Sequence, residues 1–130
     1  MLDKIRVFGL AIFMSLLIGC GGGDAVKEVN GQATNVPPDA SYDQVKRAIQ
    51  QAGIGLGWQM KEVQRGLIRG TLFIRSHVAK VDIPFDTNTY SIKYQDSSED
   101  LNYDGTTIHG AYNRWVTKLD QRIQAQLSAI

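Results

Sequence analysis

The feature that most constrains the fold is a regular alternation of apolar and polar side chains in the middle of the chain. It runs through four segments, at residues 57–63, 67–75, 79–85 and 90–94. Short polar turns separate these segments. A two-residue period with short turns is typical of antiparallel strands that bury one face and expose the other. The sequence therefore predicts an antiparallel, four-stranded meander sheet with one apolar face.

Segments with helical spacing precede and follow these strands. Ser41 and Gln44 form a capping-box pattern, so we expect a helix to begin at Ser41 and to end at the glycines of residues 53–57. Between residues 108 and 130, apolar side chains recur at steps of three and four, which predicts a second, amphipathic helix of about six turns. Because the sheet and both helices carry apolar faces, we expect a two-layer α+β domain in the order α-β-β-β-β-α, with both helices on one face.

The first 20 residues differ from the rest of the chain. Lys4 and Arg6 precede a run of mostly apolar residues that ends at Gly19 and Cys20, the only cysteine. A basic start, a short apolar core and a small residue at the end are typical of a secretory signal. The run is shorter than the roughly 20 residues that a bilayer span needs. An uncleaved membrane anchor or a buried helix is the alternative interpretation.

The residues Leu17-Ile18-Gly19-Cys20 resemble the lipobox of bacterial lipoproteins at every position. The resemblance implies cleavage before Cys20, attachment of a diacylglycerol to its thiol and acylation of the new amino end. Two or more acyl chains hold a protein stably on a bilayer, whereas one chain holds it only marginally. Such proteins are typically kept in the inner membrane by an aspartate after the cysteine. Because Gly21 stands there, the resemblance implies the outer membrane, with the domain facing the periplasm.

These patterns divide the chain into a cleaved signal peptide at residues 1–19, a lipidated Cys20 with a flexible tether at 20–40, and a globular domain at 41–130. The tether is predicted because its glycines, mixed polar residues and proline pair show no period. The signal holds two of the 14 basic and one of the 13 acidic residues, so the charge of the mature chain is balanced. Balanced charge argues against a nucleic-acid partner.

No pattern predicts catalysis or a cofactor. The segment from Asp100 to Gly105 resembles the opening of an EF-hand calcium loop, but Ala111 stands where the bidentate glutamate is required. Weak Ca²⁺ binding through Asp96, Asp100 and Asp104 remains an alternative. With two histidines and one cysteine in the chain, a zinc site is poorly supported, so we expect no metal site. The serines lack a nucleophile elbow, and we expect a protein that is not an enzyme.

The polar face of the predicted sheet is a candidate binding surface. Its basic and aromatic residues are Lys61, Arg69, Phe73, Lys80 and Lys93. Basic side chains around an exposed phenylalanine suit an anionic partner, such as a lipid headgroup, a glycan carboxylate or an acidic protein surface. The alternative is a solvated face whose charges prevent aggregation.

Much of residues 41–127 is also similar to a family of small uncharacterised bacterial lipoproteins. The similarity is carried by motifs such as Arg75-Ser76-His77, Leu101-Asn102-Tyr103 and the run from Tyr112 to Val116. It implies a candidate cluster made up of Arg75, His77, Asn102, His109, Tyr112, Asn113 and Trp115. We therefore expect a lipid-anchored periplasmic domain that binds or scaffolds an envelope protein or glycan. The alternative is a lipoprotein that binds a small ligand or weakly binds Ca²⁺ through the loop at residues 96–109.

Overall fold

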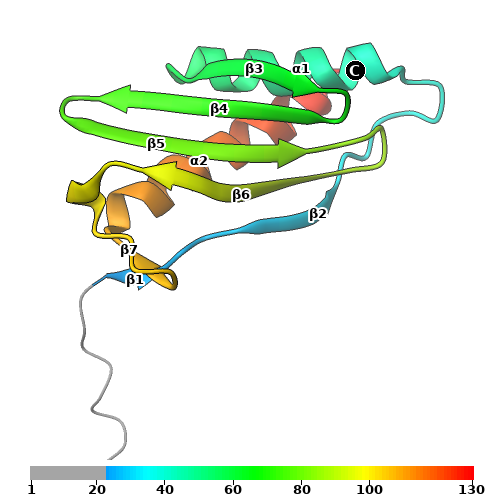
Figure 1. The fold of residues 1–130 in the computed structure, drawn as a ribbon. Helices are drawn as coiled ribbons and strands as arrows, with labels where there is room; N and C mark the ends of the chain where they lie inside the picture. Colours follow the sequence, from blue (N-terminus) through cyan, green and yellow to red (C-terminus); the bar gives the residue numbers. More distant parts are fainter. Residues whose placement is uncertain (1–22) are drawn as a thin grey trace, which may run out of the picture.

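The computed structural model describes residues 23–130, which form an α+β domain of two layers (Figure 1). Five antiparallel strands lie in the order β2-β6-β5-β4-β3, and two further strands, β1 and β7, pair separately. The strands are β1 (Asp24–Ala25), β2 (Val29–Ala33), β3 (Gln59–Gln64), β4 (Leu67–Ile74), β5 (His77–Pro84), β6 (Thr89–Ser97) and β7 (Thr107–Ile108). The helices α1 (Tyr42–Gly55) and α2 (Gly110–Leu127) lie on the same side of the sheet. The predicted class, α+β with an antiparallel sheet and two helices, is confirmed.

Both helices begin at a side-chain cap. In α1 the hydroxyl of Ser41 accepts a hydrogen bond from the Gln44 N–H at 3.1 Å, and the Gln44 side chain accepts one from the Ser41 N–H at 2.9 Å. This is the capping box that the sequence predicts. In α2 the cap is His109, whose Nδ1 accepts a hydrogen bond from the Ala111 N–H at 3.1 Å.

The alternation along the meander places one side of each strand in the core. The cross-strand pair of Ile68 and Ile83 is fully buried, as are Val81 and Ile92. The apolar stripe of α2 covers them, and its Ile123 is also fully buried. The domain therefore has one core between the sheet and the two helices.

The prediction of four strands needs correction, and the described part of the predicted tether, residues 23–40, contains two strands. Strand β2 adds a fifth strand at the free edge of β6, and β1 pairs with β7. Sequence periodicity misses β2 because only Val29 enters the core, while Gly31, at φ +61°, and a register shift interrupt the alternation. Local pattern cannot reveal a strand whose partner lies about sixty residues away.

The segment after the meander is also more ordered than a polar loop. Strand β6 continues to Ser97, and a 3₁₀ turn, η2 (Glu99–Leu101), buries Leu101 completely.

The expected signal peptide at residues 1–19 and the lipidated Cys20 lie outside the described residues. Within residues 23–130, no helix is long and apolar enough to span a membrane.

Candidate functional site

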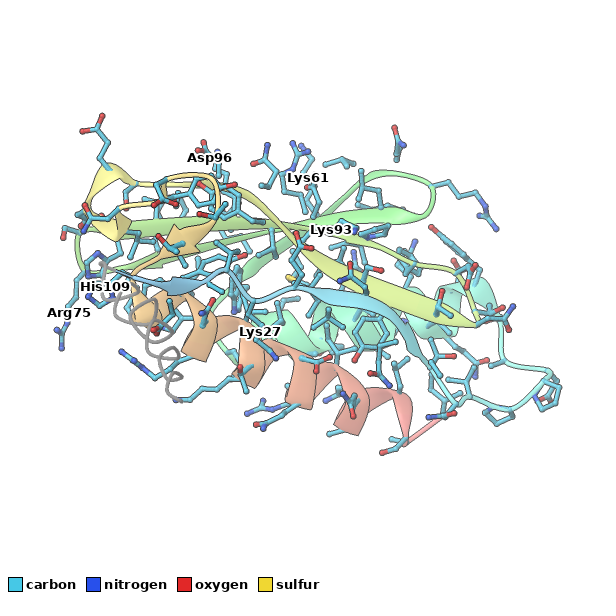
Figure 2. All side chains as sticks on the ribbon, turned by 90° about the horizontal axis from the view of Figure 1, so that it is seen from below. Lys27, Lys61, Arg75, Lys93, Asp96 and His109 are labelled. Carbon is cyan, nitrogen blue, oxygen red and sulfur yellow. The ribbon has the colours of Figure 1, made fainter. Side chains whose placement is uncertain are left out.

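The open face of the sheet brings the predicted basic residues together. One row of cross-strand partners runs from Lys61 to Arg69, then to Asp82 and Lys93. The neighbouring row includes Lys80 and Asp96. Figure 2 shows Lys61 and Asp96 on the side of the sheet that faces away from α2. Neither helix covers this face.

The rows contain one strong ion pair. Arg69 donates from Nε to Asp82 Oδ1 at 2.7 Å and from Nη2 to Oδ2 at 3.2 Å, and this hydrogen bonding raises the pKa of Arg69. Lys93 Nζ donates to Asn30 Oδ1 at 3.0 Å, which links β6 to β2. Lys61, one strand beyond Arg69, is exposed. The face therefore keeps a basic excess around a neutralised Arg69–Asp82 pair.

The predicted cluster of seven residues does not form one site. Three of its members, His77, Asn113 and Tyr112, have separate structural roles. His77 Nδ1 lies 2.8 Å from Asp100 Oδ2, and its ring centroid lies 5.9 Å from that of Trp115. Hydrogen bonds from Ser98 and His77 hold the pKa of Asp100 below its usual range. This group joins the β4–β5 hairpin to η2 and to α2.

Asn113 binds the N-terminal segment. Its Oδ1 accepts a hydrogen bond from the Lys27 N–H at 2.8 Å, and its Nδ2 donates one to the Ala25 carbonyl at 2.7 Å. The side-chain amide thus acts as a short strand partner for residues 25–27. This role is structural, and the sequence carries no local sign of it.

Tyr112 lies in the core and has no hydrogen-bond partner for its hydroxyl, which is the one such buried side-chain atom among residues 23–130. Burial raises its pKa. Its ring meets Tyr94 edge-on at 5.7 Å, and Tyr94 stacks on Tyr103 at 3.8 Å. An orphaned buried hydroxyl is destabilising.

Of the other four members, Trp115 is partly buried against the core, and Arg75, Asn102 and His109 are exposed. Asn102 and His109 line an open groove together with Gly23, Asp104 and Thr107. Arg75 lies at the β4–β5 turn with a φ of +57°. Figure 2 shows Arg75 and His109 at the same end of the domain.

The segment with EF-hand-like spacing, from Asp100 to Gly105, leads into a turn that the hydrogen bonds of Asp104 stabilise. Its Oδ1 accepts hydrogen bonds from the N–H groups of Thr106 at 2.9 Å and Thr107 at 2.7 Å, and its Oδ2 accepts one from the Thr107 hydroxyl at 2.9 Å. These bonds, the backbone ones first, lower the pKa of Asp104. In the part of the chain that the structure describes, no three acidic, histidine or cysteine side chains are grouped to hold a metal ion.

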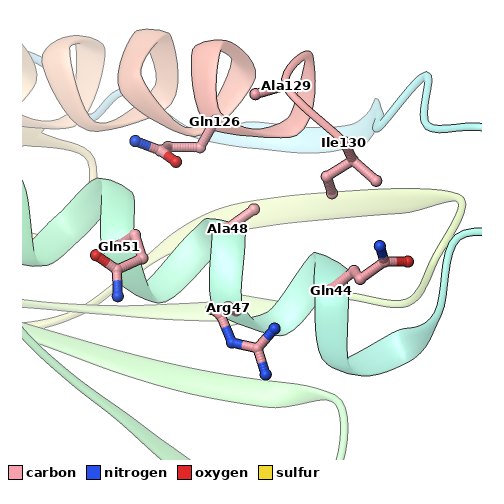
Figure 3. A pocket seen from close by; sticks show the side chains of 7 residues that line it. All are labelled: Gln44, Arg47, Ala48, Gln51, Gln126, Ala129 and Ile130. Carbon is pink, nitrogen blue, oxygen red and sulfur yellow. The ribbon is translucent and has the colours of Figure 1, made fainter.

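Two further open grooves are present, and the first overlaps the loop at residues 96–109 that the sequence suggests as an alternative ligand site. One lies along the loop after β6 and is lined by Tyr94, Asp96, Ser97, Ser98, Glu99, Asn102 and Tyr103. The other lies between the helices, where Gln44, Arg47 and Gln51 of α1 face Gln126 and Ile130 (Figure 3). No periodic pattern in either helix marks these positions.

A scan against protein-family models, a search of curated proteins and a search of solved structures each found no match. A function for this chain must therefore be inferred from the arrangement of its own residues.

Proposed function

We propose that this protein is a lipid-anchored, non-enzymatic domain of the bacterial cell envelope that binds an anionic envelope partner, a protein or a glycan, through the open face of its sheet. The anchor is the acylated Cys20, and the location is the periplasmic side of the outer membrane. The lipobox-like Leu17-Ile18-Gly19-Cys20 supports the anchor.

The single observation that supports binding is the uncovered sheet face with its basic excess. Sheets of two-layer domains usually present mixed charges to solvent. Here Lys61, Lys80 and Lys93 outnumber Asp96 around one Arg69–Asp82 pair, while Phe73 is 59% exposed. A basic face attracts an anionic partner at long range, and this attraction weakens as salt rises.

Photo-crosslinking in cells tests this face. A crosslinker at Thr71, in the row beside Arg69, should capture a specific partner, and the charge reversals Lys61→Glu and Lys93→Glu should abolish the adduct. Lys118→Glu is the matched control, because Lys118 is an exposed lysine on α2. An adduct that survives the sheet reversals, or is lost equally with Lys118→Glu, contradicts the proposal. Cys20→Ala should release the protein from the membrane fraction.

The second candidate function is binding of a small ligand by the loop at residues 96–109. The observation that favours it is the pair of grooves that flank this loop, with the stacked Tyr94 and Tyr103 in one of them. NMR titration with a fragment set tests it. Shifts confined to residues 94–109 support it, and shifts on Lys61, Arg69 and Lys93 favour the sheet face.

A further inference from the structure

The start of the folded domain lies very close to the expected lipid anchor. From Asp24 the chain is held by β7, and the Val26 N–H donates to the Thr106 carbonyl at 3.1 Å. Asn113 holds the next residues. An extended chain spans at most about 3.6 Å per residue, so Gly23 lies within about 11 Å of the Cα of Cys20. If Cys20 carries acyl chains, this end of the domain must therefore lie against the bilayer.

The same end of the domain contains the β4–β5 turn, and a series of contacts joins the turn to Gly23. His77 after the turn is bonded to Asp100 of η2, and the carbonyl of Leu101 accepts a hydrogen bond from the His109 N–H at 2.8 Å. His109 in turn lines the groove that contains Gly23. Figure 1 shows β1, β7 and the β4–β5 turn at one end, with the β5–β6 turn at the other.

The β4–β5 hairpin projects beyond its neighbouring strands. Pairing of β3 ends at the Gln59–Thr71 pair, and pairing of β6 ends at the Ala79–Ser97 pair. Residues 73–78 therefore form a two-stranded tip, which contains the pairs Phe73–Val78 and Ile74–His77.

The tip has two exposed apolar side chains just before its polar turn, and it is fixed at its base. Phe73 is 59% exposed and Ile74 is 37% exposed, and Arg75 follows them at the turn. At the base, the Val78 N–H donates to Ser98 Oγ, and the Ser98 N–H donates to the Val78 carbonyl, both at 2.9 Å. Phe73 and Ile74 point to opposite faces of the hairpin, and a fixed base keeps both side chains near its end, which a flexible loop would not do.

We infer that the tip is a second membrane contact. Its residues Phe73, Ile74 and Arg75 insert into the interface of the bilayer that holds Cys20. This inference rests on the proposed lipid anchor. Phenylalanine and isoleucine enter the boundary between headgroups and acyl chains, and the arginine keeps its charge at the headgroups. Anchor and tip together fix how the domain sits on the membrane. The basic rows of the sheet are then held at a constant angle to the bilayer.

The charges around the tip indicate which kind of lipid it would contact. Asp96, Glu99, Asp100 and Asp104 lie on the elements around the tip, so this end is not a basic surface. The contact should therefore depend on apolar insertion, which does not require anionic lipid and resists salt.

Site-specific fluorescence on the acylated protein tests the inference. Because Cys20 is the only cysteine and its sulfur would be blocked by lipid, the new thiol of the variant Ile74→Cys can be labelled alone with an environment-sensitive dye. Asn88→Cys is the matched control, since Asn88 is exposed in the β5–β6 turn at the opposite end. Both proteins are reconstituted into phosphatidylcholine vesicles, with and without doxyl lipids, and flotation measures anchoring.

The expected result is a shift to shorter wavelength at position 74 and quenching by doxyl lipids several-fold stronger than at position 88, unchanged by high salt. Adding Phe73→Ser should return the signal at position 74 towards that in water, with the far-ultraviolet circular dichroism unchanged. If the protein floats with vesicles but both labels report water, the tip contact is wrong and the anchor stands. A blue shift without doxyl quenching, which marks burial against protein, also overturns the inference. Failure to float overturns the anchor together with the tip.

Discussion

The hydrogen bonds of Asn113 make a specific prediction about the N-terminal segment. The substitution Asn113→Ala removes the acceptor for the Lys27 N–H and the donor to the Ala25 carbonyl. The helix itself should tolerate the change, because alanine is a good helix former. We therefore expect the segment from Asp24 to Lys27 to detach more often from β7 and α2 while the core stays intact.

The size of the effect can be worked out from two hydrogen bonds in a partly exposed place. Each such bond contributes about 0.5–1.5 kcal/mol, and water can replace part of this, so the loss should be about 1–2 kcal/mol. Such a loss corresponds to roughly a 5- to 30-fold increase in the open population.

Hydrogen exchange measured by NMR is the direct assay, because it reports local opening of individual amides. The N–H groups of Val26 and Lys27 should exchange about 5- to 30-fold faster in Asn113→Ala. Core amides such as that of Ile83 should change much less. Arg114→Ala, at an exposed neighbouring position, is the control and should leave all these rates unchanged. Unchanged exchange at Lys27 in Asn113→Ala would refute the assignment of Asn113 as the residue that holds this segment.

Three further predictions concern stability. Tyr112→Phe should leave the urea unfolding free energy unchanged or raise it by up to about 1 kcal/mol, because the buried hydroxyl has no partner; a large loss would show that the hydroxyl is satisfied. Ile123→Ala should cost about 2–5 kcal/mol, since the side chain is fully buried, whereas the exposed control Gln121→Ala should stay within about 0.5 kcal/mol. Hydrogen bonds lower the pKa of Asp104 in the fold, so its carboxylate stabilises the protein above the ordinary aspartate pKa of about 3.9, and this contribution is lost as the pH falls below that value. Asp104→Asn should therefore make acid unfolding depend less steeply on pH, and an unchanged acid limb would contradict this.

The sequence predicts the meander and both helices well because each carries its own pattern. Ile68, Val81 and Ile92 alternate with polar residues and are all fully buried, as a two-residue period requires. The capping box at Ser41 is equally local. Strand β2 has no such sign, because its pairing with β6 is decided by the free edge of a distant strand.

The candidate site, too, could be predicted from the sequence only in part. The open sheet face could be predicted, since alternation alone places Lys61 and Lys93 opposite the core. The predicted cluster around the helix start does not form one site, because the partners of its members come from elsewhere in the chain. His77 finds Asp100, and Asn113 binds residues 25–27. Similar residue types can therefore serve packing and capping where a motif suggests binding.

The exposed tip of the β4–β5 hairpin shows a limit of the two-residue period. Ile74 follows the same alternation as Ile68 and Leu72, but it is 37% exposed. Strand β4 continues past the end of β3 at this point, so Ile74 has no neighbour from β3 beside it. Periodicity indicates which face a residue occupies, and only the tertiary structure shows whether anything covers that face.

The attachment of lipid to Cys20 is the claim on which location, orientation and partner all depend. The most direct test is the intact mass of the protein isolated from bacterial membranes. We expect a chain that begins at Cys20 and is heavier than its residues by a diacylglycerol and a further acyl group. A mass that retains residues 1–19, or that shows Cys20 unmodified, would contradict it.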